Sequence, residues 1–373
     1  MAPRLRVALD ATSLLGPRTG VGQVTAGLLE ALASRGDLDL RAYAITWRGR
    51  HELDDAVPAG VTAATKPFPA RGTRVLWPRV PVPRIEHWTG DVDVVHATAF
   101  VAPPAHAPVL LTIHDLTYLR FPEMCTDDTR SYARLVRVAL ERGVTVHTYS
   151  DFVADEVREH YGLPSERVVR VYPGLATITG GDPRRGHEIA GSPRYVLALS
   201  TIEPRKNLPM LVRAFDVVAA DDADLRLVVA GPPGWGIDAF DEAVRAARHA
   251  ASIHRLGYVD AAARRDLLAG ATVLAYPSIY EGFGHPPLEA MQCDVPVVAS
   301  SAGPLPEVLG DAALLPDPTD VDSIADALRR ALTDDELRGQ LIARGRERVA
   351  RYDWERTTRE MTALYERLAA RAR

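Results

Sequence analysis

The sequence predicts an α/β protein made of two Rossmann-like domains, and two observations support that prediction. Short apolar runs alternate with segments of helical period along almost the whole chain of 373 residues. A stretch rich in glycine, proline and charge, residues 179–193, interrupts the alternation, which then starts again. Apolar strands separated by helices are typical of parallel sheets covered on both faces, so each series predicts one such sheet.

The first series extends from residue 5 to residue 173. Strands are predicted at 5–11, 40–46, 93–98, 109–115, 144–150 and 167–173. Helices are predicted at 22–36 and 151–162. Ligands of open parallel sheets bind beyond the carboxyl ends of the strands. Candidate binding and catalytic residues are therefore expected in the loops that follow these strands.

The second series begins after the interruption. Strands are predicted at 194–200, 225–231, 271–278 and 295–301, a helix at 208–219 and a last helix at 352–371. Residues 179–193 show no apolar period and are interpreted as an interdomain linker. We therefore expect an N-terminal domain at 1–180, a C-terminal domain at 194–350, and a terminal segment, 351–373, that carries the last helix.

Composition excludes several classes of protein. The formal net charge of −5 argues against a basic nucleic-acid-binding surface, so no nucleic-acid partner is expected. No run of about 18 apolar residues is present, and Asp10 interrupts the first apolar stretch, which favours a strand over a secretory signal. Two cysteines, Cys125 and Cys293, make no disulfide framework. We expect a cytoplasmic protein.

The most informative motif is EGFGHPPLEAM (281–291), in which Glu281 and Glu289 flank seven residues. It follows a predicted strand and leads into a helix predicted to begin at Pro287. Gly282 and Gly284 allow a ligand to approach the backbone closely, and amides at a helix start attract anions. Ionised carboxylates accept hydrogen bonds from hydroxyl groups. Together these features predict a site for a sugar attached to a phosphate.

A second motif, EPRKN (203–207), also follows a predicted strand. Asn207 is placed to cap the helix that starts at Leu208, which puts Arg205 and Lys206 at the positive end of that helix. Lys206 is one of only two lysines in the chain. Two cations at a helix start are suited to binding a diphosphate, and the alternative is a surface ion pair with Glu203.

These segments resemble the E-x7-E motif and the E-P-x-K-N segment of retaining GT-B glycosyltransferases of family 4, and the similarity continues through 256–259 and 305–315. The resemblance implies a GT-B fold, in which the C-terminal helix within 351–373 crosses back onto the N-terminal domain. It implies that Glu281 contacts the transferred sugar, that Glu289 holds the ribose, and that Arg205 and Lys206 hold the donor diphosphate. The remaining residues expected to line the donor site are Gly282, Phe283, Gly284, Tyr258 and Val259.

Two N-terminal segments extend the resemblance. The loop GPRTGVG (16–22) is neither a P-loop nor a dinucleotide fingerprint. In the family, a similar loop of the N-terminal domain lines the cleft near the donor phosphates and the acceptor, and Gly20 and Gly22 are the matching positions. His114 ends a predicted strand, and family members often have His-Asp there, with the histidine beside the donor sugar. Asp115 is expected either to orient His114 or to cap the following loop.

No metal and no cofactor are expected. Asp91-Val-Asp93 and Asp222-Ala-Asp224 spell D-x-D, which metal-dependent GT-A enzymes use, but both triplets are interpreted as structural. Family 4 enzymes are metal-independent, so Arg205 and Lys206 would stabilise charge instead. The resemblance implies a front-face path in which the leaving diphosphate takes the proton of the incoming hydroxyl. Glu281 would orient the sugar rather than attack it.

The pattern looks most like bacterial mannosyltransferases that use GDP-mannose. UDP-sugars and dTDP-rhamnose are open alternatives as nucleotide-sugar donors. Two other classes of protein remain: a sugar-nucleotide epimerase or phosphorylase of the same fold, and a non-catalytic nucleotide-sugar sensor. Of these, a phosphorylase would need a lysine for pyridoxal phosphate, and neither Lys66 nor Lys206 is placed for one.

The acceptor is expected to be a glycan or a lipid-linked sugar bound by the N-terminal domain. The stretch RGTRVLWPRVPVPR (71–84) has four arginines around Trp77 and no acid. Arg130, Arg134 and Arg137 are spaced to lie along one face of a helix. Either feature could contact anionic lipid headgroups at the inner membrane surface, and an ordinary solvated face is the alternative.

Overall fold

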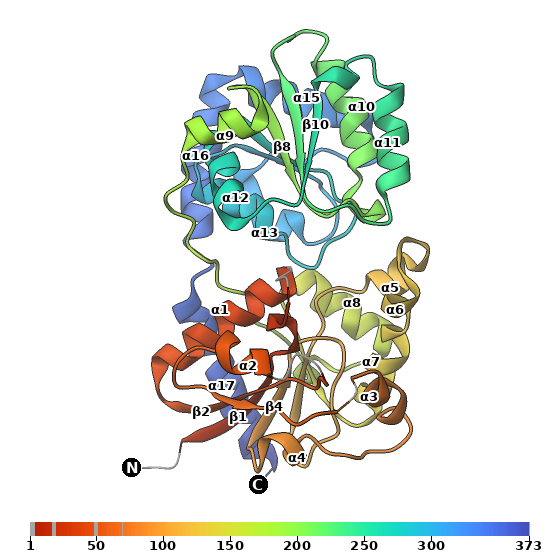
Figure 1. The fold of residues 1–373 in the computed structure, drawn as a ribbon, viewed down its shortest axis with the longest axis vertical. Coiled ribbons are helices and arrows are strands. Elements are labelled where there is room, and N and C mark those ends of the chain that lie inside the picture. The colour runs from red at the N-terminus through yellow and green to blue at the C-terminus, as the bar shows by residue number, and fades with distance from the viewer. Residues whose placement is uncertain (1–3, 17–19, 48–50, 69, 373) are drawn as a thin grey trace. The chain divides into compact units, whose positions relative to one another are not determined.

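The computed structural model describes residues 4–16, 20–47, 51–68 and 70–372, and in it the chain forms two compact units. The N-terminal unit comprises Met1–Gly174 together with Tyr352–Arg373, and the C-terminal unit comprises Leu175–Arg351. Each unit is a parallel sheet covered by helices (Figure 1). The predicted α/β class with two Rossmann-like sheets is therefore confirmed.

The N-terminal unit contains a seven-stranded parallel sheet in the order β3-β2-β1-β4-β5-β6-β7. Its strands are β1 Leu5–Asp10, β2 Leu38–Tyr43, β3 Thr62–Ala64, β4 Val94–Ala97, β5 Val109–Thr112, β6 Thr145–Thr148 and β7 Val168–Arg170. The interior strands β4 and β6 are buried along their whole length, as expected for a sheet covered on both faces.

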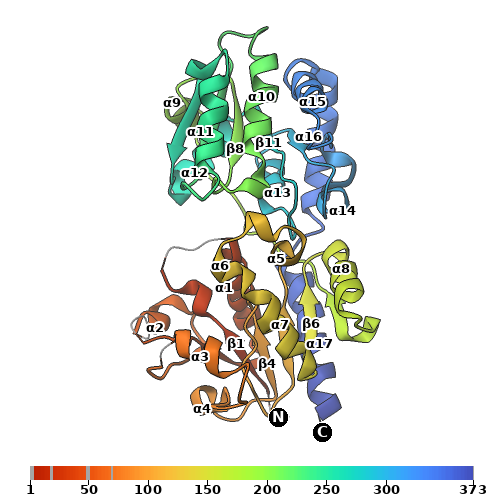
Figure 2. The same cartoon turned by 90° about the vertical axis from the view of Figure 1, so that its right-hand side faces the viewer.

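Helices cover both faces of this sheet. They are α1 Gly20–Arg35, α2 Glu52–Ala56, α3 Ala70–Leu76, α4 Glu86–Thr89, α5 Thr117–Arg120, α6 Asp127–Arg130, α7 Tyr132–Glu141, α8 Asp151–Tyr161 and α17 Trp354–Ala372. Val7 and Leu9 of β1 face α1 and α17, which lie side by side (Figure 1). On the opposite face α7 and α8 pack against β6 (Figure 2).

A chain of buried polar groups links α17 to the middle of this sheet. His147 Nε2 lies 3.1 Å from the Val171 carbonyl, which can only accept, so Nε2 donates and Nδ1 accepts from Thr112 Oγ1 over 2.9 Å. Thr112 in turn accepts from His96 Nε2 over 2.8 Å, and His96 Nδ1 accepts from the Tyr365 hydroxyl over 2.7 Å. Every group is satisfied only while both histidines are neutral.

The C-terminal unit contains a five-stranded parallel sheet in the order β10-β9-β8-β11-β12. Its strands are β8 Tyr195–Leu199, β9 Arg226–Ala230, β10 Ile253–Gly257, β11 Val273–Tyr276 and β12 Val297–Ala299. Its helices are α9 Pro183–Ala190, α10 Leu208–Val218, α11 Ile237–Ala246, α12 Ala261–Gly270, α13 His285–Gln292, α14 Leu305–Leu309, α15 Val321–Thr333 and α16 Asp335–Val349. An apolar core joins α10 and α15 to one face of the sheet.

The predicted linker at 179–193 is wrong, because this stretch contains helix α9. Asp182 caps the helix through a hydrogen bond from the Arg184 amide, and α9 packs against α12. The packed face consists of small residues, since a Cβ at Gly186 would come 2.1 Å from the Asp266 carbonyl oxygen. A face without large apolar side chains shows no apolar period, which is why the pattern indicated a linker. The division between the units falls after Gly174.

Among the described residues, no helix combines the length and the apolar character that crossing a membrane requires. Cys125 and Cys293 are both free thiols.

Candidate active site

The residues singled out at 203–207 and at 281–284 lie in loops that follow neighbouring strands of the C-terminal unit. β8 and β11 are adjacent in the sheet, and both end at the same edge because they are parallel. The loop after β8 carries Arg205 and Lys206, and the loop after β11 carries Glu281. The Ile279 amide donates to the Arg205 carbonyl over 2.8 Å. The two loops therefore form a single site.

Glu281 is hydrogen-bonded to both cations. Lys206 Nζ donates to Oε1 over 2.5 Å, and the Arg205 guanidinium donates to Oε2 over 2.7 Å. Arg205 also bonds Glu203 over 3.0 Å, and Lys206 donates to the Tyr276 hydroxyl over 2.9 Å. The side chains of Lys206 and Glu281 are only 11% and 7% exposed. The Arg205–Glu203 contact is therefore part of a larger, mostly buried network. It is not the isolated surface ion pair that was the alternative hypothesis for this motif.

Charge determines the protonation of this network. Burial alone would raise the pKa of Glu281, but Lys206 and Arg205 lower it to about 2, so the carboxylate is ionised. Burial lowers the pKa of Lys206, as does the neighbouring Arg205, while Glu281 opposes both effects. Phosphate oxygens are the other ligand that guanidinium and ammonium groups bind strongly. The two cations can therefore exchange their carboxylate partner for a diphosphate.

The prediction that the Asn207 side chain caps α10 is wrong. The backbone at Asn207 is left-handed, with φ of 56°, and the side chain makes no capping bond. Its Nδ2 instead donates to the carbonyls of Pro277 and Pro318 over 3.2 and 2.8 Å. Asparagine tolerates this conformation better than most residues. Asn207 thus ties the two site loops together, and Arg205 and Lys206 lie in a 3-10 turn, Pro204–Lys206, just before α10.

The loop between β11 and α13 contains the predicted glycines. Gly284 precedes the helix with φ of 109°, which side chains rarely adopt, and a Cβ there would come 2.6 Å from Leu305. Phe283 is buried, whereas Gly282 is half-buried. The helix begins at His285, two residues before the predicted start. The loop therefore needs glycine at position 284 for its backbone geometry.

Glu289 lies on α13 and is bonded to a residue that the sequence analysis did not single out. The Arg264 guanidinium, on α12, donates to Glu289 Oε2. The Glu289 side chain is 14% exposed, and burial raises its pKa while Arg264 opposes that shift. No local pattern could have indicated Arg264, because 25 residues separate it from Glu289.

Two family models match the chain. The model described as Glycosyltransferase Family 4 matches residues 18–177, and the one described as Glycosyl transferases group 1 matches residues 182–348. O-antigen chain mannosyltransferase B of Escherichia coli is 32% identical over 286 residues, which cover 74% of this chain and 74% of that protein. The chain belongs to the family 4 glycosyltransferases.

A second relative and a solved structure are also similar to the chain. Phosphatidyl-myo-inositol mannosyltransferase of Mycolicibacterium smegmatis is 28% identical over 84% of this chain and 82% of its own length. The structure of sucrose-phosphate synthase from Thermosynechococcus elongatus matches with a TM-score of 0.76 at 19% identity, covering 98% of this chain and all of that one. With its two parallel sheets, the glycosyltransferase therefore has the GT-B fold.

The other residues expected at the donor site of this glycosyltransferase follow β10, which is an edge strand of the same sheet. Tyr258 is 73% exposed, and Val259 is half-buried. An exposed aromatic ring beyond a strand end can stack on a flat ligand. Contact of these two residues with a nucleotide base stays a prediction.

The N-terminal unit of the glycosyltransferase holds His114 just after β5. Its Nε2 lies 2.7 Å from the Thr98 carbonyl, so Nε2 carries the proton and Nδ1 is an acceptor. The ring packs against Phe100 and Tyr149. Burial lowers the pKa of His114, while the bond to Thr98 and the nearby Asp115 oppose the shift. The Asp115 carboxylate accepts from the Thr117 amide and so caps the next turn.

The predicted glycine-rich loop is described only in part, because residues 17–19 lie outside the described set. Gly20 is the first residue of α1, and Gly22 is buried in its first turn. A Cβ at Gly20 would meet nothing within 4 Å. Local packing therefore does not require glycine at position 20, and contact of Gly20 and Gly22 with a donor stays a prediction.

Both D-x-D triplets contribute to structural ion pairs. Asp93 bonds Arg6 over 2.8 Å, and Asp222 bonds Arg194 over 2.6 Å. Within the described parts of the chain, no cluster of three or more histidine, cysteine, aspartate or glutamate residues is arranged to hold a metal ion.

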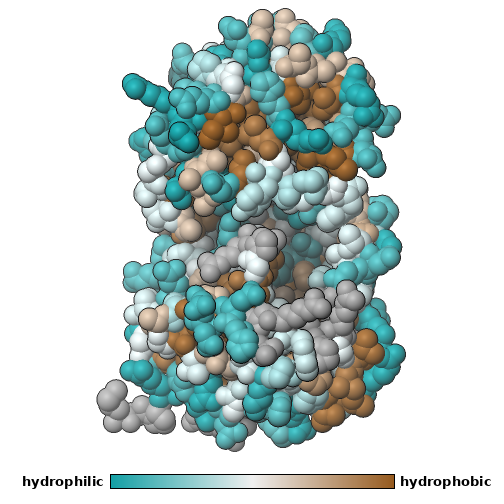
Figure 3. Space-filling view, in the orientation of Figure 1, coloured by the Kyte–Doolittle hydropathy of each residue, from teal (hydrophilic) through white to brown (hydrophobic). Residues whose placement is uncertain are grey.

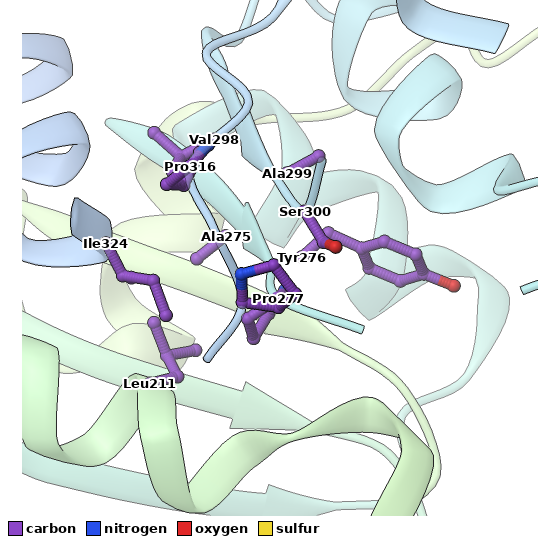
Figure 4. Close-up of a pocket in the computed structure, with 10 residues that line it drawn as sticks. Leu211, Ala275, Tyr276, Pro277, Val298, Ala299, Ser300, Pro316 and Ile324 are labelled. Carbon is purple, nitrogen blue, oxygen red and sulfur yellow. The ribbon is translucent and has the colours of Figure 1, made fainter. Parts of the chain in front are cut away.

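A small apolar pocket lies behind the charged network, at the ends of β11 and β12. Leu211 and Ile324 point toward Pro277 in it, while the Tyr276 ring points its hydroxyl away from them (Figure 4). The pocket leaves no room for a water molecule. It is a packed support for Tyr276, whose hydroxyl accepts from Lys206.

Proposed function

We propose that this glycosyltransferase transfers mannose from GDP-mannose to a hydroxyl of a glycan or a lipid-linked sugar, with retention at the anomeric carbon. The observation that carries the proposal is the pair of cations, half-buried Arg205 and buried Lys206, held with Glu281 at the ends of two adjacent strands. Mannose is favoured because two relatives are named mannosyltransferases. UDP-sugars and dTDP-rhamnose are the alternative donors.

The proposed reaction needs no metal ion. The acceptor oxygen bonds the anomeric carbon on the face from which the diphosphate departs, the carbon–oxygen bond to the diphosphate breaks, and the acceptor proton passes to a phosphate oxygen. Arg205 and Lys206 stabilise the negative charge that develops on the leaving group. Glu281 orients the sugar hydroxyls, and Glu289 accepts hydrogen bonds from the ribose.

The N-terminal unit is proposed to bind the acceptor, and His114 is proposed to contact the transferred sugar. Its Nε2 proton is committed to the Thr98 carbonyl, so Nδ1 is the atom that would accept a bond from a sugar hydroxyl. Because burial lowers its pKa, His114 stays neutral at physiological pH.

A panel assay tests the proposed function. The protein is incubated with GDP-mannose, UDP-sugars and dTDP-rhamnose, and nucleotide release is measured with and without glycan and lipid-linked acceptors. We expect GDP release that depends on an acceptor, and a product with the anomeric configuration of the donor by NMR. Binding without any release would indicate a sensor, and an altered sugar formed without an acceptor would indicate an epimerase. Either result would overturn the proposal.

We also propose that the N-terminal unit contacts an anionic membrane surface through α3 and the turn that follows it. Val75, Val80 and Val82 are 59%, 37% and 52% exposed, and Arg79 beside them is exposed. Brown surface appears at the lower right of Figure 3, where Figure 1 labels α3. The side chains of Arg71 and Arg74 lie outside the described set. Valines next to arginine fit a bilayer interface with anionic headgroups.

Helix α7 continues this surface. The Arg142 guanidinium donates to the Trp77 carbonyl, which fastens the turn after α3 to the end of α7. Arg134 and Arg137 of α7 are exposed. We expect the protein to sediment with phosphatidylglycerol vesicles and not with phosphatidylcholine vesicles. Val80→Asp should abolish sedimentation, whereas Trp235→Asp, which changes an exposed side chain of the C-terminal unit, should not. Equal sedimentation of both variants would contradict the proposed surface.

A further inference from the structure

The ion pair between Arg264 and Glu289 adds a component to the donor site. Arg264 lies on α12 and Glu289 on α13, and the guanidinium bonds only one carboxylate oxygen, Oε2. Among the described residues, no hydrogen bond reaches Oε1. The carboxylate is therefore held by one oxygen while the other stays available as an acceptor.

The titratable groups that lie near Glu289 on its own helix include no cation that could replace Arg264 as its counter-ion. On α13 itself, His285 lies one turn before Glu289 and Cys293 one turn after it. Glu289 raises the pKa of the Cys293 thiol, an effect secondary to burial, so the two groups are close.

The other elements packed against α13 supply no second counter-ion. Helix α16 presents Arg346, which is bonded to Asp294. The strands β11 and β12 carry no acidic or basic side chain. Of the groups in the described chain, Arg264 is the cation whose bond and charge favour the ionised form of Glu289.

We propose that Arg264 is a positioning residue of the donor site: by bonding Oε2 it fixes the Glu289 carboxylate so that Oε1 accepts hydrogen bonds from the ribose hydroxyls of the donor. This inference rests on the proposed function, in which Glu289 holds the ribose. Ribose hydroxyls are donors to a carboxylate, whereas a protonated Glu289 would lose acceptor capacity and place its own proton in the site.

The consequence of losing Arg264 depends on pH. Burial favours the neutral form of Glu289, and without Arg264 nothing bonded to it opposes that effect. Its pKa would then rise further, and the fraction of ionised Glu289 would fall as the pH falls. Ribose binding would weaken toward acid and recover toward alkali, whereas a purely structural defect would weaken binding at every pH.

The test measures GDP binding by calorimetry between about pH 6 and about pH 8.5 for the wild type, Arg264→Met and Arg264→Lys. The control is Arg265→Met, which changes the adjacent arginine on the same helix. We expect Arg264→Met to weaken GDP binding about tenfold or more at the acid end, with most of the loss recovered at the alkaline end. Arg264→Lys should restore most of the affinity, and Arg265→Met should behave as the wild type.

A second ligand separates the inference from the function on which it rests. The wild type should bind GDP more tightly than 2′,3′-dideoxy-GDP, and Arg264→Met should lose that discrimination at the acid end. Unchanged discrimination in Arg264→Met, or a loss of affinity that is equal at every pH, would overturn the role of Arg264. If Glu289→Gln also bound GDP as tightly as the wild type, the proposed ribose contact itself would be wrong.

Discussion

The two units have similar parallel sheets but differ in the charge state of the polar side chains that these sheets hold. In the C-terminal unit, Arg205, Lys206 and Glu281 form an ionised network in which charge holds the pKa of the carboxyl at about 2. In the N-terminal unit, burial lowers the pKa of His114, as it does for His147 deeper in the sheet, and the bonds of both histidines to backbone carbonyls only partly oppose it.

This difference shows that the same sheet architecture can hold either compensated charges or neutral polar groups. Buried charges are retained only where partners compensate them, and the C-terminal unit retains cations that an anionic ligand can share. In the N-terminal unit, the buried histidines of the sheet are neutral, and their hydrogen bonds are made to groups of the same unit. Changes of charge should therefore affect the reaction mainly through the C-terminal unit, and pH should affect stability mainly through the N-terminal unit.

The largest expected effect comes from neutralising the carboxylate of the C-terminal network. Glu281→Gln should lower turnover by about 100-fold or more, because the sugar loses the negatively charged acceptor that orients it in the transition state. GDP binding should not weaken, since Arg205 and Lys206 no longer share their charge with a carboxylate. Steady-state kinetics and calorimetry measure the two quantities. Turnover close to that of the wild type would remove Glu281 from the mechanism.

The second prediction concerns acid stability of the N-terminal unit. Burial lowers the pKa of His147 to about 3 and lowers that of His96 well below its ordinary value. Unfolded histidines bind protons below about pH 6.5, and these folded ones do not, so stability is lost as the pH falls from about 6.5 toward 3. Each histidine should contribute a slope of up to about 1.4 kcal/mol per pH unit.

Urea unfolding followed by tryptophan fluorescence measures this effect. Four of the five tryptophans lie in the N-terminal unit, and only Trp235 lies in the other. His147→Gln should be less stable at neutral pH but should show a shallower loss of stability toward acid. A wild-type stability that did not change between about pH 7.5 and about pH 5.5 would contradict the neutral histidine chain.

The smallest expected effect is that of His114→Ala. Turnover should fall about tenfold, because one hydrogen bond to the transferred sugar is lost, while the affinity for GDP, which lacks the transferred sugar, should be unchanged. This result would strengthen the contrast with the C-terminal unit, in which we propose that the diphosphate binds. A loss of GDP affinity as large as the loss of turnover would show that the two units do not divide the donor in this way.

Local sequence pattern was sufficient for the parts of the site that lie within one loop. The spacing of Glu281 and Glu289, and the sequence of Arg205 and Lys206 after a strand, are local signals that the fold brings together because β8 and β11 are neighbours. The strand periodicity likewise predicted both sheets. These features depend on residues close together in the chain, so the sequence alone could indicate them.

Features that depend on distant contacts could not be predicted. Arg264 meets Glu289 only because α12 packs against α13. The cap at Asn207 was predicted wrongly because its left-handed backbone turns the side chain toward Pro277 and Pro318. Helix α9 was missed because its buried face consists of small residues such as Gly186 and Ala190. In each case the residue or helix that determines the local structure lies far away in the sequence.

The most direct test is to compare the affinities of the wild type and Lys206→Ala for GDP and GMP. If the C-terminal unit grips a diphosphate, the wild type should prefer GDP strongly, and Lys206→Ala should lose most of that preference. The matched control is Lys66→Ala, which removes the chain's other lysine, an exposed residue of the N-terminal unit, and should keep the preference. A Lys206→Ala variant that remained folded and still preferred GDP as strongly as the wild type would contradict the account.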